Sequence, residues 1–68
     1  MDFTIEIEQE NDGRWIAEVL ELPGVLVYGQ TSDEARAKAQ ALALRVVAER
    51  LEQGEIAPNL VSVSFAAA

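Results

Sequence analysis

The chain contains no cysteine and no histidine, and its five basic residues face twelve acidic ones. Without cysteine, the chain has no disulfide, no thiolate nucleophile and no thiolate metal ligand. Without histidine, it lacks the side chain that most often acts as a general base near neutral pH. We therefore expect no catalytic activity, no metal and no cofactor. The absence of cysteine also fits the cytoplasmic location that we expect.

Positive charge is scarce, and the formal net charge is −7 over 68 residues. Proteins bind nucleic acids mainly by neutralising phosphates with Lys and Arg, so direct binding to DNA or RNA is not expected. An acidic surface favours solubility, and it also attracts basic protein partners.

Long apolar runs are absent too. None approaches the roughly 20 residues that a membrane span needs, and the start Met1-Asp2 lacks the positive charge of a signal peptide. We expect no membrane association and a single globular domain over residues 1–68. A core of this size is near the lower limit for independent stability, so a homo-oligomer, either a dimer or a tetramer, is expected.

Alternating polarity predicts an N-terminal hairpin. The first strand places Phe3, Ile5 and Ile7 on one side, and the second runs from about residue 14 to residue 20. To share a face with the apolar residues of the second strand, Ile7 must lie opposite Ala17. This register leaves a three-residue loop, Asn11-Asp12-Gly13, with Gly13 in the left-handed conformation.

A third strand and a long helix follow the turn Leu22-Pro23-Gly24. The strand is expected over residues 25–28 and the helix over residues 32–53, with Gly54 as the residue that ends it. Thr31 is the predicted N-cap. Glu34 stands three residues later, where it can complete a capping box on the Thr31 N–H.

The helix carries two apolar stripes. The stripe expected to face the sheet consists of Ala35, Ala39, Leu42, Ala43 and Val46. The stripe on nearly the opposite side consists of Ala37, Ala41, Leu44, Ala48 and Leu51. Exposed alanine is explained by helix propensity. Leu44 and Leu51 are less easily explained in this way, so we treat them as candidates for contact with another chain.

A last strand is expected over residues 61–65, after a connector at 56–59 that contains Pro58, with residues 66–68 as a frayed tail. A helical crossover places this strand parallel to an earlier one. The simplest arrangement is an α+β fold of type β-β-β-α-β with strand order 3-2-1-4 and one helix on one face. The other face would carry Thr4, Glu6, Glu8, Ile16, Glu18, Leu20, Leu26, Tyr28, Ser62 and Ser64.

That uncovered face holds the main candidate interaction site. Ile16, Leu20, Leu26 and Tyr28 would lie there on neighbouring strands. Contiguous exposed apolar surface usually marks a site of interaction, so we expect these residues to contact either a protein partner or another copy of the chain. The expected homo-oligomer would use this face or the second stripe of the helix. Trp15, by contrast, shares its side with Ile5 and Ile7, so we expect it in the core.

Three segments together resemble a known family. They are Trp15-x-Ala17, then Leu22-Pro23-Gly24, then Gly29-x-Thr31-x-x-Glu34-Ala35. Their order and spacing are similar to those of the HicB family of bacterial antitoxins, and the resemblance covers residues 3–65. It implies a partial ribonuclease-H-like sheet and a small basic HicA-type toxin that cleaves messenger RNA as the partner. Many HicB proteins continue into a DNA-binding module beyond the position of Ala68, so operator binding is not expected of these residues.

Two other functions stay open. The chain could be an orphan homo-oligomeric scaffold that binds no toxin. It could also be a residual nuclease, because ribonuclease-H-like enzymes hold two metal ions with acids from the sheet and helix. Glu6, Glu8, Glu49 and Glu52 are the carboxylates in question. The last strand offers only serines, so we do not expect these acids to converge.

Overall fold

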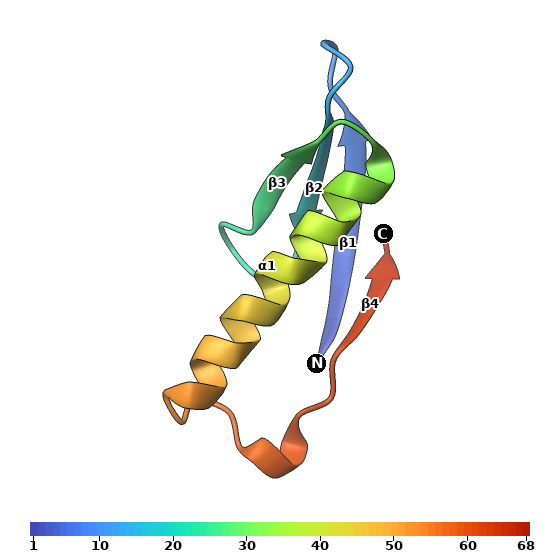
Figure 1. The fold of residues 1–68 in the computed structure, drawn as a ribbon. Helices are drawn as coiled ribbons and strands as arrows, with labels where there is room; N and C mark the ends of the chain where they lie inside the picture. The colour runs from blue at the N-terminus through green and yellow to red at the C-terminus, as the bar shows by residue number, and fades with distance from the viewer.

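The computed structural model describes all 68 residues as a four-stranded mixed sheet with one long helix on one face (Figure 1). The strands are β1 (Asp2–Gln9), β2 (Trp15–Val19), β3 (Leu26–Gly29) and β4 (Ser64–Ala67). The helix is α1 (Ser32–Glu52), and a short 3-10 helix, η1 (Pro58–Leu60), precedes β4. The order is β3-β2-β1-β4, with only β4 parallel to its neighbour. The predicted α+β fold and strand order are confirmed.

The hairpin has the register that the apolar pattern predicts. Ile7 lies opposite Ala17, and the loop is closed by a hydrogen bond of 2.7 Å from the Glu10 N–H to the Arg14 carbonyl oxygen. Gly13 adopts a φ of +92°, which other residues rarely tolerate. The three-residue loop keeps one side of β1 and β2 apolar, and this side is the one that α1 covers.

Both ends of the helix are capped by the residues that the sequence predicts, Thr31 and Gly54. The Thr31 hydroxyl accepts the Glu34 N–H at 3.0 Å. At the other end, Gly54 has a φ of +74°, and the Gly54 and Glu55 N–H groups donate to the carbonyls of Leu51 and Arg50. The other half of the predicted capping box is wrong, because the Glu34 carboxylate pairs with Lys38 at 2.9 Å instead.

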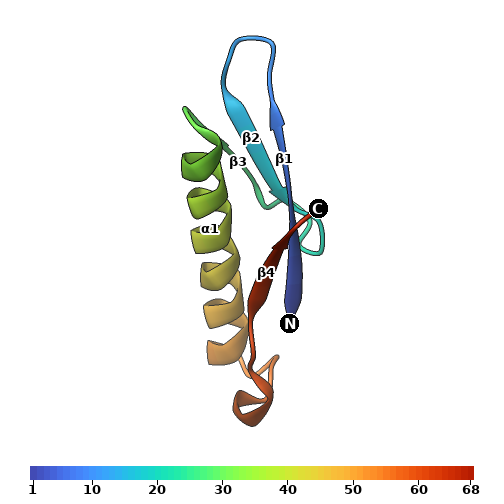
Figure 2. The ribbon, with the colours of Figure 1, turned by 90° about the vertical axis from the view of Figure 1, so that its right-hand side faces the viewer.

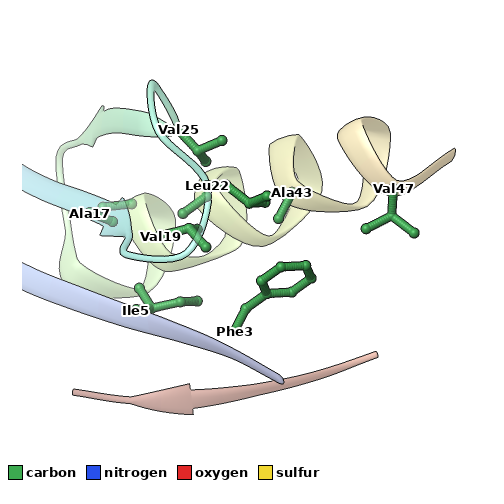
Figure 3. Close-up of a cluster of buried hydrophobic side chains, with 10 residues drawn as sticks. Phe3, Ile5, Ala17, Val19, Leu22, Val25, Ala43 and Val47 are labelled. Carbon is green, nitrogen blue, oxygen red and sulfur yellow. The ribbon is translucent and has the colours of Figure 1, made fainter. Parts of the chain in front are cut away.

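Three alanines bring α1 close to the sheet. The buried residues of the helix are Ala35, Ala39, Ala43 and Val47, spaced by steps of four. The core they form with the sheet also contains Phe3, Ile5, Ala17, Val19, Leu22 and Val25 (Figure 3). A step of four advances slightly more than one helical turn, so the buried stripe slants around the helix. For this reason Val47 replaces the predicted Val46 as the buried residue, while Leu42 and Val46 are only half-buried.

The last strand lies later in the chain than predicted. It pairs Asp2 with Ser64 and Ile5 with Ala67, and the Ala68 N–H donates to the Ile5 carbonyl at 2.9 Å. Residues 66–68 are therefore part of the ladder or next to it, and the prediction of a frayed tail is wrong. The shift has a simple cause: β1 begins at Asp2, so residues 61–63 have no strand residue to pair with.

Candidate protein-interaction surface

One side of the sheet has no helix over it, and we call this side the outer face. Figure 2 views the sheet nearly edge-on, with α1 on one side and open space on the other. Strand pairing places on this face Thr4, Glu6, Glu8, Ile16, Glu18, Leu20, Leu26, Tyr28 and Ser64. Ser62 lies outside the strands, the other predicted residues are present, and the pairing adds Asp2 and Ala66 to this face.

The four predicted apolar residues come together on β2 and β3. Ile16 lies directly opposite Tyr28, and Leu26 lies opposite Glu18. Leu20 follows the last residue of β2 and continues its alternation, with its N–H bonded to the Thr4 carbonyl. Tyr28, Leu26 and Leu20 are 40%, 43% and 47% exposed, whereas Ile16 is half-buried. Large apolar side chains are thus grouped where the fold itself provides no cover.

Carboxylates share this surface with the apolar residues. Glu6 on β1 lies opposite Glu18 on β2, and Glu8 lies opposite Ile16. The fold contains two ion pairs, Arg14–Asp12 and Lys38–Glu34, and neither involves these three acids. The outer face therefore combines apolar side chains with negative charge that no cation of the chain neutralises.

Arg14 modifies the edge of this surface in a way the sequence did not lead us to expect. Its guanidinium carbon lies 4.4 Å from the centre of the Tyr28 ring, within the range of a cation–π contact. Asp12 fixes the side chain with a 2.7 Å ion pair and accepts the Arg14 N–H at 3.0 Å, and the pKa of Asp12 is lowered by these bonds. The spacing Asp12-x-Arg14 was a signal for the pair, but contact with Tyr28 requires the sheet register.

Glu21 follows Leu20 in the chain and bonds to Thr4 at one end of the outer face. Its carboxylate accepts the backbone N–H and the hydroxyl of Thr4, each at 2.7 Å. These two bonds lower the pKa of Glu21, the backbone bond being the larger cause. The carboxylate takes the place of a strand carbonyl as the acceptor for the Thr4 N–H. β2 has already ended here, and the Leu20 N–H, which donates to the Thr4 carbonyl at 3.0 Å, makes the last backbone hydrogen bond to β1 at this end.

The two candidate contact residues on the helix, Leu44 and Leu51, differ in their exposure to solvent. Leu44 is 47% exposed and its stripe neighbours Ala37, Ala41 and Ala48 are exposed as well. Leu51 is half-buried and packs against the core. It continues the four-residue steps of the buried stripe beyond Val47, so its expected position on the side away from the sheet is wrong. Leu44 is left as a single large apolar residue among alanines.

The structure offers no enclosed site for chemistry. No pocket is present, and no group of three or more acidic residues could hold a metal ion. Glu6 and Glu8 project from the outer face, whereas Glu49 and Glu52 belong to the helix on the opposite side of the sheet. No helix of the structure combines the length and the apolar character that are needed to cross a membrane.

Comparison with known proteins gives no family assignment. A scan of the chain against protein-family models finds no match, and searches among curated proteins and among solved structures also return none.

Proposed function

We propose that this chain is a HicB-like antitoxin domain whose outer face binds and masks a small basic protein. The observation that carries the proposal is the composition of that face, on which exposed Leu20, Leu26 and Tyr28 adjoin three carboxylates without cationic partners. Contiguous apolar surface is suited to burial against another protein. The surrounding negative charge favours a partner rich in Lys and Arg.

The physics of such a complex follows from the neighbours of Glu18. Glu18 lies opposite Glu6 on one side and Leu26 on the other, so a basic side chain that reaches it also covers apolar surface. Like charges opposite each other in a sheet are destabilising, and an incoming cation relieves that repulsion. Aromatic and arginine side chains frequently dominate binding energy, which makes Tyr28, with Arg14 against its ring, the natural anchor.

The identity of the partner rests on the resemblance to the HicB family. That resemblance implies a HicA-type toxin that cleaves messenger RNA, encoded beside the antitoxin and acting in the cytoplasm. In this function the chain itself performs no catalysis and needs no cofactor. It acts by occupying the toxin surface that would otherwise reach RNA.

A second candidate is an orphan homo-oligomeric scaffold that has no toxin. The core contains only ten buried hydrophobic residues, and oligomerisation would add burial to it. Net charge of −7 opposes self-association through the acidic outer face, so that face suits a basic partner better than a second copy.

The test is co-expression with the adjacent reading frame, provided that it encodes a small basic protein. The wild-type chain should relieve growth arrest and block RNA cleavage by that protein. Leu26→Asp should lose this protection, whereas Leu44→Asp, which changes an equally exposed leucine on the helix, should keep it. Protection that survives Leu26→Asp contradicts the assignment of the surface. A neighbour that neither binds the chain nor cleaves RNA contradicts the antitoxin function.

A further inference from the structure

The free edge of β4 presents unpaired backbone groups. The Ser64 N–H donates to the Met1 carbonyl and the Ala68 N–H donates to the Ile5 carbonyl, both at 2.9 Å. Successive residues of a strand direct their backbone groups to opposite sides. Phe65 and Ala67 therefore direct their N–H and C=O groups away from β1. Figure 2 looks toward this edge, and no other segment lies in front of β4.

This edge is short, with four residues in β4, but it lacks the side-chain and backbone features that usually prevent pairing with another chain. Such features are charged side chains, proline and bulges. Residues 56–68 contain no charged side chain, and β4 itself contains neither proline nor glycine. The opposite edge is different, because the Lys38 ammonium donates to the Tyr28 carbonyl at 3.4 Å and Arg14 covers the Tyr28 ring.

The helix side of the sheet is also open next to β4. Helix α1 contacts mainly β2 and β3, which are on the far side of β1 from β4 (Figure 1). Phe65 contacts Phe3 with ring centres 5.7 Å apart, yet Phe65 remains half-buried, as does Val63. Additional chain along this edge would therefore satisfy backbone groups and cover apolar side chains together.

We propose that a second copy of this chain occupies this edge, with β4 antiparallel to its counterpart about a two-fold axis at Ala66. In this register Phe65 lies opposite Ala67 of the other copy, so the outward groups of both residues form four hydrogen bonds. The two sheets become one sheet of eight strands. A second copy fits this edge because its own β4 offers the matching row of outward N–H and C=O groups. The net charge of −7 opposes contact elsewhere, and segment 56–68, which has no charged side chain, is where two copies meet at least electrostatic cost.

This arrangement has a consequence for the outer face. A two-fold axis normal to the sheet leaves both helices on one side and both outer faces on the other. The dimer would therefore present two copies of the acidic and apolar surface side by side, while leaving Leu20 and Tyr28 uncovered. The dimer does not depend on the antitoxin proposal, because it uses different residues.

The experiment introduces charge at Ala66, which is exposed and would meet its own copy across the axis. Dimerisation is measured by sedimentation equilibrium, and folding by circular dichroism. Ala66→Lys and Ala66→Glu should each raise the dimer dissociation constant by up to about fivefold, because Cα atoms in such a pair lie only about 4.5 Å apart. An equal mixture of the two variants should dimerise again. Ala66→Ser is the neutral control and should behave as wild type.

A second variant does not depend on charge. Ala67→Pro removes an N–H that points away from β1, so it should abolish the dimer while leaving the β1–β4 ladder intact. Leu20→Asp, on the outer face, should leave the dimer unchanged. A wild-type chain that is monomeric up to its highest soluble concentration overturns the proposal. A dimer that survives Ala67→Pro, or that Leu20→Asp dissociates, overturns it as well.

Discussion

Glu6 and Glu18 face each other across the central strands β1 and β2, and both are exposed. Neither is joined to a cation, although the chain has five basic residues. Four of those bases, Arg36, Lys38, Arg45 and Arg50, belong to the helix on the other side of the sheet. The fold thus keeps most of the positive charge away from the outer face, and it leaves a repulsive pair in the middle of the surface that we assign to a partner.

The first prediction concerns this pair. Glu18→Gln should stabilise the isolated protein by about 0.2–1 kcal/mol, because it removes repulsion between directly opposed like charges. The gain should shrink as salt is added, since both groups are exposed to solvent. Urea unfolding at low and high salt measures both effects. Glu10→Gln, next to the hairpin loop, is the matched control, and a Glu18→Gln protein less stable than this control would be contrary to expectation.

The second prediction concerns the approach of the helix to β3. A Cβ at Gly29 would lie 2.6 Å from the Ala35 backbone nitrogen, so the helix start would have to move. Gly29→Ala should cost about 3 kcal/mol or more, as expected for overpacking against backbone. Gly24→Ala meets no atom within 4 Å and suffers only from its φ of +88°, so it should cost about 1–2 kcal/mol. Equal losses in urea unfolding would refute the close approach.

The third prediction separates the two halves of the helix cap. Thr31→Ala should cost about 1 kcal/mol, because the Glu34 N–H loses its acceptor. Thr31→Ser should cost little, since the hydroxyl is kept. Glu34→Gln should cost only a few tenths of a kcal/mol, because this carboxylate pairs with Lys38 at the exposed surface rather than with Thr31. A loss for Glu34→Gln as large as that for Thr31→Ala would instead indicate a complete capping box.

The fourth prediction concerns acid. Hydrogen bonds from Thr4 lower the pKa of Glu21 in the folded protein. A carboxyl with a lowered folded pKa adds stability above its unfolded value, which is about 4.3, and loses that contribution as pH falls through the folded value. Unfolding free energy should therefore decline with acidification below about pH 4.3. In Glu21→Gln this part of the decline should be missing, and an unchanged pH profile would exclude Glu21 as its source.

Much of the fold was predictable because local rules agreed with one another. Alternation in the first two strands, the position of Gly13 and the crossover before the last strand together fix the sheet order and register. The residues of the outer face were predicted from the alternation of side chains along each strand alone. The position of the last strand could not be predicted from the nearby sequence, because the apolar alternation begins at Val61 and continues through Val63 to Phe65. Only the start of β1 at Asp2 decides which of these residues pair.

Errors on the helix have one physical origin. Periodicity identifies an apolar stripe, but not the angle at which the helix crosses the sheet. Steps of four from Ala35 lead to Val47 and then to Leu51, which therefore packs against the core and does not form part of a second surface. Contacts between distant side chains, such as Arg14 on Tyr28 and Glu21 on Thr4, depend on the register and on where β2 ends. They appear only once the strands are placed.

The most direct test of the account is the affinity of the outer face for the small basic protein encoded beside this chain, measured by titration calorimetry. Wild type and Leu44→Asp should bind alike, whereas Leu26→Asp should bind at least about thirtyfold more weakly, since a central apolar contact is worth about 2 kcal/mol or more. Affinity should also fall with salt. Equal binding by Leu26→Asp and wild type, or loss of binding only in Leu44→Asp, would contradict the assignment of this face as the partner surface.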